Sequence, residues 1–411
     1  MGNDTRERFD GPAWETLEVW VREQARDMIQ QALEEEVTEL LGRVKSERRA
    51  AVDAPPGYRN GHGKPRRLAM SSGTIEVRRP RVRGLEERFE SRVLPLFARR
   101  TREVGDLIPE LYLHGLAEGD FELALRGLLG DGAPLSKSSV RRLRARWTAE
   151  HEAWSRRPLG DRELVYAWAD GIYVKAGLER DKAALLVVIG AMSDGTKEVL
   201  AVTPGYRESV ESWAAVLRDL KARGLATPKL LVADGNLGIW GAAREVWPET
   251  AEQRCWNHKT TNVLDRLPKR EQIAAREMLR AAAYAPSRAA AKEARDAFAD
   301  RYADAQSKAV AVLEDDWERM TAFYDFPEKH WRHLRTTNVV ESPFASVRLR
   351  TTAAKRFKRV DNATALIWRL LLVAEKRFRK LNAPHLLREV YEGRRFEDGK
   401  PVPEGQKRIA A

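Results

Sequence analysis

The sequence contains a single cysteine, Cys255, among its 411 residues. One cysteine cannot build a disulfide framework within the chain, so we expect a reducing compartment and a fold held by its hydrophobic core. No run of apolar residues is long enough to span a bilayer, and the first residues lack the hydrophobic stretch of a signal peptide. These absences predict a soluble protein of the cytoplasm.

Acidic residues are also in deficit, because 61 Asp and Glu face 73 Lys and Arg and leave a net charge of +12. Such an excess favours a polyanionic partner, most often nucleic acid, although basic enzymes without one are common. Hydrophobic residues make up 43% of the chain. The length and this fraction are enough for a sizeable core and for two or three domains.

The N-terminal third alternates between helical and extended patterns. Apolar residues at helical spacing predict a helix within 14–44. The Pro- and Gly-rich stretch 54–67 is typical of a loop or linker. Residues 67–82 predict a hairpin, in which Pro80 confines the second strand to a sheet edge.

Residues 104–147 predict three helices separated by short breaks. The last of them is basic, with Arg141, Arg142, Arg144 and Arg146. This order fits a helix-turn-helix that binds DNA. It fits equally well an ordinary three-helix bundle whose basic face is solvated, and the residues alone do not separate the two.

Beyond residue 162 the pattern changes to strand, strand, strand, helix, strand, helix. Because the fourth strand follows a crossover, we expect an α/β fold with a mixed sheet and helices on both faces. Residues 259–335 are almost wholly helical in pattern. A further helix follows residue 338, and an amphipathic one covers 362–381.

Two apolar strands end in Asp-Gly, at Asp170 in "VYAWADG" and at Asp234 in "KLLVADG". Asp-Gly usually marks a turn, but the carboxyl ends of strands in open α/β sheets are where sites assemble. Glu341 opens a late helix, begun either by a capping box at Asn338 or by Ser342 and Pro343. It would then be a simple capping residue, or the third acid of a cluster that holds Mg²⁺.

The stretch around Glu341, "RTTNVVESPFASVRLRTTAAKRFKR", is strongly basic. If the acid holds a metal, its cationic neighbours would hold the phosphates of a nucleic acid. Trp331 is the best candidate for stacking on an unpaired base. The residues expected to contact phosphates here are Arg335, Arg348, Arg350, Lys355, Arg356, Lys358 and Arg359.

Four segments, "YAWADGIYVK", "LLVADGNLGIW", "EQRCWNHKTTNVLDRLPK" and "FYDFPEKHWRHLRTTNVVESPFASVRLRT", resemble the Mutator-like family of bacterial insertion-sequence transposases. The resemblance implies an RNase H-like catalytic core with an Asp-Asp-Glu triad and an all-helical insertion before the Glu. The triad falls on Asp170, Asp234 and Glu341, which would catalyse and bind Mg²⁺, with Mn²⁺ able to substitute. Val339 stands where many relatives carry Pro, and no catalytic residue is missing.

The family's Cys-x-x-His element falls on Cys255 and His258. With His330 and His333 these residues could offer four zinc ligands. Cysteine at a strand-to-helix junction commonly packs as a small apolar residue instead. We therefore expect the element to brace the sheet near Asp234, and we do not expect zinc.

The resemblance implies a nucleoid-associated bacterial DNA transposase, working on DNA as a homodimer or larger assembly. It would bind terminal inverted repeats, cleave the element ends by phosphodiester hydrolysis and join the 3′-OH to target DNA. The alternatives are a DNA-binding regulator derived from a transposase and a structure-specific nuclease without strand transfer. The expected domains are a helical, possibly dimerising region (1–50), a basic linker and hairpin (51–98), a helix-turn-helix-like domain (99–155), the first part of the core (156–265), the helical insertion (266–335), the final core helices (336–382) and a tail (383–411).

Overall fold

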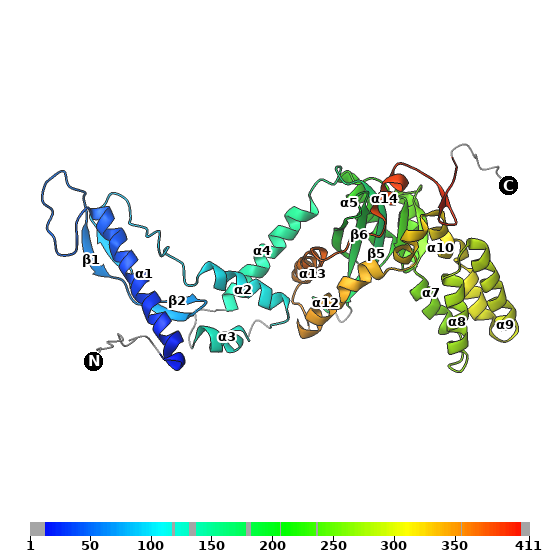
Figure 1. The fold of residues 1–411 in the computed structure, drawn as a ribbon, viewed down its shortest axis with the longest axis horizontal. Coiled ribbons are helices and arrows are strands. Elements are labelled where there is room, and N and C mark those ends of the chain that lie inside the picture. The colour runs from blue at the N-terminus through cyan, green and yellow to red at the C-terminus, as the bar shows by residue number, and fades with distance from the viewer. Residues whose placement is uncertain are drawn as a thin grey trace, which may run out of the picture. The chain divides into compact units, whose positions relative to one another are not determined.

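The computed structural model describes residues 13–116, 120–130, 137–177, 182–205, 207–235, 237–354 and 356–403. The chain divides into two compact units, Met1–Leu143 and Arg144–Ala411, and Figure 1 labels many of their elements. Among the described residues, no helix combines the length and the apolar character that a membrane crossing requires.

In the first unit, a long helix packs on two small antiparallel sheets. The short η1 (Trp14–Thr16) leads into α1 (Leu17–Leu41), which ends at Gly42 with φ of 62°. The left-handed conformation at Gly42 is the usual helix stop, so the helix predicted within 14–44 is confirmed. The core side chains of this unit come from α1, the strands and the loop after them: Leu33, Leu68, Ile75, Val77 and Leu94.

The strands of this unit confirm one prediction and correct another. The hairpin predicted in 67–82 is formed by β2 (Arg66–Met70) and β3 (Gly73–Val77). The loop predicted over 54–67 is wrong in part, because β1 (Tyr58–His62) pairs with β4 (Pro80–Arg83). Strand β1 has no apolar alternation, so only its partner reveals it. Pro80 is the first residue of β4, and β4 is an edge strand because its sheet has two strands.

The three helices predicted over 104–147 are present. They are α2 (Arg102–Leu113), α3 (Phe121–Leu129) and α4 (Lys137–Ser155). The buried side chains of Leu143 and Trp147 lie on one face of α4. Helix α4 crosses from the first unit into the second.

The second unit is built on a five-stranded mixed sheet, in the order β7-β6-β5-β8-β9. The crossover is confirmed, because β8 lies parallel beside β5 whereas β5, β6 and β7 are antiparallel neighbours. The predicted order of elements left out β9, since "AEQR" is polar and short, but the strand-to-helix junction expected at Cys255 is confirmed. The strands and the two helices between them are β5 (Leu164–Val174), β6 (Ala183–Met192), β7 (Lys197–Gly205), α5 (Val210–Ala222), β8 (Leu230–Ala233), α6 (Leu237–Val246) and β9 (Ala251–Arg254).

Helices cover both faces of this sheet, as predicted. Ala167 and Ala169 of β5 share a core with Trp213 of α5 and Trp240 of α6. Alternate residues of a strand point to opposite faces, and the opposite face is contacted by α12, α13 and α14. These helices are α12 (Asn338–Ala354), α13 (Val360–Glu375) and α14 (Pro384–Tyr391). A mixed α/β architecture follows.

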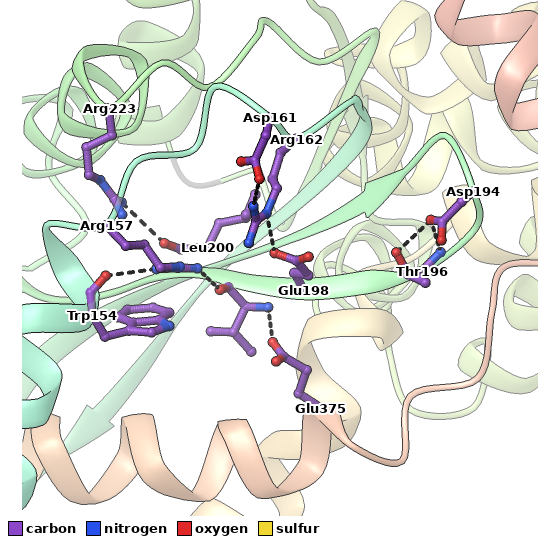
Figure 2. Close-up of polar contacts among 11 residues, drawn as sticks. Trp154, Arg157, Asp161, Arg162, Asp194, Thr196, Glu198, Leu200, Arg223 and Glu375 are labelled. Atoms are coloured by element: carbon purple, nitrogen blue, oxygen red, sulfur yellow. Dashed lines mark hydrogen bonds and ion pairs between the residues drawn. The ribbon is translucent and has the colours of Figure 1, made fainter.

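Side chains, rather than another strand, form hydrogen bonds with the backbone of the edge strand β7 (Figure 2). The Arg157 guanidinium donates to the carbonyl of Val199 at 2.8 Å and lies 3.9 Å from the Trp154 ring centroid. The backbone N–H of Val199 donates to the Glu375 carboxylate. Burial, with the nearby Arg223 cation, lowers the pKa of Arg157 to about 10. These contacts satisfy backbone groups that would otherwise be open to pairing with another chain.

The segment 259–335 is helical throughout its regular elements, as predicted. A buried ion cluster fastens it to the sheet, because Asp316 accepts from Lys259 at 2.9 Å, from Arg319 at 2.9 Å and from Arg254. The elements are α7 (Trp256–Leu264), α8 (Gln272–Ala283), α9 (Arg288–Glu314), α10 (Trp317–Thr321), η2 (Ala322–Asp325), η3 (Glu328–His330) and α11 (Trp331–Leu334). After α14, β10 (Phe396–Glu397) and β11 (Lys400–Pro401) form a small hairpin.

Candidate active site

Asp170 and Asp234 lie side by side on neighbouring strands. The parallel pairing of β5 with β8 ends at Ala169 and Ala233, and each aspartate is the next residue. The prediction that Asp170 ends its strand is wrong, because β5 continues to Val174 through its pairing with β6. Asp170 therefore sits where the parallel pairing stops, which is the position that parallel strands give to binding sites.

A third carboxylate, from Glu208, joins these two. Ligand atoms of Asp170, Glu208 and Asp234 all lie within 4.8 Å of one another. Glu208 and Asp170 are buried, with 7% and 9% of their surface exposed, while Asp234 is partly exposed. Sequence reasoning missed Glu208, since it precedes the ordinary N-cap residue Ser209 of α5 and no strand pattern marks it.

The carboxylates of this cluster repel one another. Burial, followed by the Asp234 carboxylate, raises the pKa of Asp170 to about 7, with smaller contributions from Glu208 and Glu341. The Gly171 N–H, which donates to Asp170 Oδ1 at 2.8 Å, opposes this shift. Buried carboxylates that repel one another favour either a proton or a cation between them. The all-oxygen donor set fits a hard divalent ion such as Mg²⁺.

Glu341 enters the site from the first turn of α12. Its backbone N–H donates to the carbonyl of Thr337 at 3.0 Å, so the helix begins directly after Thr337. The start predicted at Ser342 and Pro343 is wrong, because Pro343 lies inside the helix. Asn338 is the first helical residue and accepts from Asn257 at 3.3 Å, so it is not a preceding cap.

The Cys255 and His258 pair lies beside Glu341. Ligand atoms of Cys255, His258 and Glu341 lie within 4.8 Å of one another. The Thr337 hydroxyl donates to the Glu341 carboxylate and lies 3.2 Å from the Cys255 sulfur. A hydrogen bond with Cys255, followed by the electrostatic effects of Cys255, Glu341 and Asp234, raises the pKa of His258 to about 9, while burial opposes the shift. These neighbours therefore favour the protonated form of His258.

The same element ties the sheet to the site. Cys255 is fully buried at the N-cap of α7, and its N–H donates to the carbonyl of Ala233 at 2.8 Å. Ala233 directly precedes Asp234. These contacts support the bracing role expected for Cys255.

The four zinc ligands considered from the sequence are not gathered at one point among the described residues. His330 is fully buried and lies with Nδ1 2.9 Å from the Tyr166 hydroxyl. Burial lowers the pKa of His330 to about 4. Trp331 is buried against Phe323 and Tyr324, so its ring faces are not free to stack on a base.

The basic residues singled out from the sequence have different surroundings. Arg350 is only 3% exposed, so its side chain is not available to phosphates in this conformation. Arg335 and Arg144 are half-buried, and the Arg335 guanidinium lies 4.7 Å from the Tyr284 ring centroid. Lys355 lies outside the described residues. Exposed side chains belong to Arg141, Arg142, Arg146, Arg348, Arg356, Lys358 and Arg359.

Comparisons with known proteins agree on one family. The family described as "Transposase, Mutator family" matches residues 12–380. The chain is 45% identical over 297 residues to the transposase for insertion sequence element IS6120 of Mycolicibacterium smegmatis, covering 72% of this chain and 92% of that protein. It is 43% identical over 281 residues to the transposase for insertion sequence element IST2 of Acidithiobacillus ferrooxidans, covering 68% and 95%. The chain therefore belongs to the Mutator family of transposases, which makes it a DNA transposase.

Proposed function

We propose that this transposase cuts DNA at the terminal inverted repeats of its element and joins the freed 3′-OH to target DNA. The observation that carries the proposal is that Asp170 and Asp234 directly follow the paired residues of neighbouring parallel strands, while α12 contacts β5 and brings Glu341 near these acids. Asp170 feels the charges of both other acids, although they are distant in the sequence. An RNase H-like core is the fold we propose for the sheet and its covering helices.

Asp170, Asp234 and Glu341 would hold two Mg²⁺ ions. When bound, such ions activate a hydroxyl nucleophile and stabilise the leaving oxygen of a phosphodiester. The chain's own contribution is position and charge. The parallel pairing of β5 and β8 places the two aspartates in adjacent positions, and α12 brings Glu341 toward them. His258, whose Nδ1 lies 3.7 Å from Glu341 and whose pKa is raised, would offset part of the negative charge of the acids.

The DNA strand would be held by cations near this site. One cavity is lined by several basic residues and a single acid: Lys329, Arg332, Arg335 and His385, with Glu328, Trp331, Asn382 and Ala383. The backbone of this segment is fixed to β5 and to the start of α7, because the carbonyls of His333 and Arg335 accept from Trp168 and Trp256. Phosphates bound in this cavity would therefore stay at a fixed position relative to Asp170. The exposed side chains of Arg348, Arg356 and Lys358 would contact further phosphates of the same DNA.

The first unit, together with the rest of helix α4, would supply recognition of the repeats. Arg141, Arg142 and Arg146 are exposed on α4, as a helix that contacts DNA requires. A homodimer or larger assembly would bring two element ends together. The single chain leaves apolar side chains of its N-terminal helices exposed, including Trp14 (84%) and Met28 (70%), which supports α1 as the dimer element.

The experiment is a cleavage assay on labelled duplex that carries the inverted repeats flanking this gene. We expect a nick at the repeat boundary that depends on Mg²⁺ or Mn²⁺. Asp234→Asn should abolish the nick and keep binding, because the amide fits the strand end but lacks the charge that holds the cation. The matched control is Asp219→Asn, at an exposed aspartate of α5.

Three other outcomes would each redirect the proposal. Binding without a nick in wild type and variant, also with paired ends supplied, would favour a regulator derived from a transposase. A nick without joined product would favour a structure-specific nuclease. Loss of binding in Asp234→Asn, with its fold intact by circular dichroism, would remove Asp234 from the catalytic role.

A further inference from the structure

We propose that Glu208 is a further acidic residue of the metal centre, and that with Asp170 and Asp234 it holds the first divalent cation in the DNA-free protein. This inference rests on the proposed metal-dependent function. It adds an acid that the Asp-Asp-Glu triad does not contain. It also assigns Glu341 to a later stage, when DNA is engaged.

Two glycines leave the space that Glu208 occupies. A Cβ atom at Gly171 would lie 2.4 Å from Glu208 Oε1, so the carboxylate occupies the space beside the residue that follows Asp170. A Cβ atom at Gly238 would lie 2.1 Å from the Glu208 carbonyl oxygen. Two glycines, from β5 and from α6, thus make room for this one residue.

A hydrogen bond orients the Glu208 side chain. Tyr173, which lies on β5 two residues beyond Gly171, forms a side-chain hydrogen bond with Glu208. A tyrosine hydroxyl donates to one carboxylate oxygen. Ligand atoms of Asp170 and Asp234 lie within 4.8 Å of a Glu208 oxygen. Three oxygen donors at this spacing suit one hard cation.

Glu341 is engaged elsewhere in the same structure. Its carboxylate accepts from Thr337 and lies 3.7 Å from His258 Nδ1. Its metal-ligand neighbours are Cys255 and His258, whereas Glu208 belongs to the group of Asp170 and Asp234. The first cation would therefore bind without Glu341. Rotation of the Glu341 side chain away from Thr337 would complete the site.

The test is a Mn²⁺ titration of the purified full-length protein without DNA, followed by the electron paramagnetic resonance signal of the free ion. Glu208→Gln is expected to weaken the tightest Mn²⁺ site by about tenfold or more. Glu341→Gln is expected to change it by less than about threefold, because Glu341 is not a ligand at this stage. Glu211→Gln is the matched control, since Glu211 lies one turn further on and is exposed; it should bind Mn²⁺ as the wild type does.

The outcomes separate this inference from the proposed function. If Asp170→Asn weakens Mn²⁺ binding and Glu208→Gln does not, Glu208 is not a ligand and the inference fails alone. If Asp170→Asn also leaves binding unchanged, the metal centre itself is wrong. Should Glu208→Gln fail to fold, Glu208→Asp is used, whose shorter side chain is expected to weaken Mn²⁺ binding as well. Wild-type affinity in a folded Glu208→Asp would overturn the inference.

Discussion

The Nδ1 atom of His258 lies 3.7 Å from Oε1 of Glu341. The two residues come from different helices, α7 and α12. Helix α7 starts beside the end of β8, because the Cys255 N–H donates to the carbonyl of Ala233, the residue before Asp234. Thr337 joins them, because its hydroxyl contacts Glu341, Cys255 and His258. The predicted third acid of the triad is thus held by a small polar network, apart from the cluster of Asp170, Glu208 and Asp234.

The network depends on one hydroxyl, so Thr337→Val tests it. Valine has the same shape, and the change removes the hydroxyl donor of the Glu341 carboxylate and one of the two donors to the buried Cys255 sulfur, which keeps the Thr337 backbone N–H. We expect the free energy of unfolding to fall by about 1–2 kcal/mol, measured by urea denaturation. Thr364→Val is the matched control, because this buried hydroxyl bonds only the Val360 carbonyl of its own helix. Equal losses at both positions would show that the network adds nothing.

Gly171→Ala tests the space beside Asp170. The new Cβ would displace the Glu208 carboxylate, which is the far end of a flexible side chain. We therefore expect a small change in melting temperature, but slower cleavage and weaker Mn²⁺ binding, each by about tenfold. Gly160→Ala is the control, since a Cβ there meets only an ordinary contact at 3.8 Å. Unchanged Mn²⁺ binding in Gly171→Ala would mean that Glu208 is not held there.

Asp316→Asn tests the ion cluster between the helical segment and the sheet. Asp316 is 7% exposed and pairs with Lys259, Arg254 and Arg319. Removing one anion leaves cations buried and under-compensated, so we expect a loss of roughly 3–5 kcal/mol in the free energy of unfolding.

Cleavage should fall in Asp316→Asn as well, because the Arg254 side chain packs over Gly235, directly after Asp234. The neighbouring exposed Asp315 gives the control, Asp315→Asn, which should change stability by less than about 0.5 kcal/mol. Comparable stability of the two variants would show that the cluster is dispensable.

The buried His330 predicts a loss of stability in acid. Burial lowers its pKa from 6.5 to about 4, so between these values the unfolded chain binds a proton that the folded chain does not. Stability is therefore retained above about pH 6.5 and falls as the pH decreases toward about 4. From about pH 7 to about pH 5 the contribution is roughly 2 kcal/mol.

The measurement is the melting temperature against pH for wild type and His330→Gln. The variant should show a shallower decrease in acid, whereas His385→Gln, at an exposed histidine of α14, should follow the wild type. A decrease in His330→Gln as steep as in the wild type would assign the acid sensitivity to other groups.

Arg348 and Arg350 form a matched pair on one helix. Arg348 is exposed and Arg350 is buried. We expect Arg348→Ala to weaken DNA binding and reduce the slope of log affinity against log salt by about 1, as the loss of one phosphate contact does. Arg350→Ala should leave the slope unchanged and lower the melting temperature, because it removes a buried side chain. The reverse pattern would place Arg350 on the DNA.

The regular elements of this protein were largely predictable because their signals are local. Helical spacing marked α1, α5 and α13, and apolar runs marked β5, β6 and β8. Strand β1 was missed and β9 was left out of the predicted order of elements, because polar strands carry no such signal and exist through their partners. Of the two starts considered for α12, the one at Ser342 and Pro343 was wrong, because Pro343 usually opens a helix, whereas here the helix already runs from Asn338.

The site was predictable only in part. Its two aspartates could be found because each follows a buried strand. Glu208 could not, since what distinguishes it is its place beside Asp170, set by the packing of α5 and α6 on the sheet.

The sequence by itself determined the order of the elements, the basic character and the family of this chain, because these depend on residue identity and spacing along the chain. Only the tertiary structure decided which carboxylates share a cluster, that Glu341 lies with Cys255 and His258, and that Arg350 is buried. The reason is physical. Periodicity is encoded within a few turns of chain, whereas contacts between distant residues depend on how whole elements pack against one another.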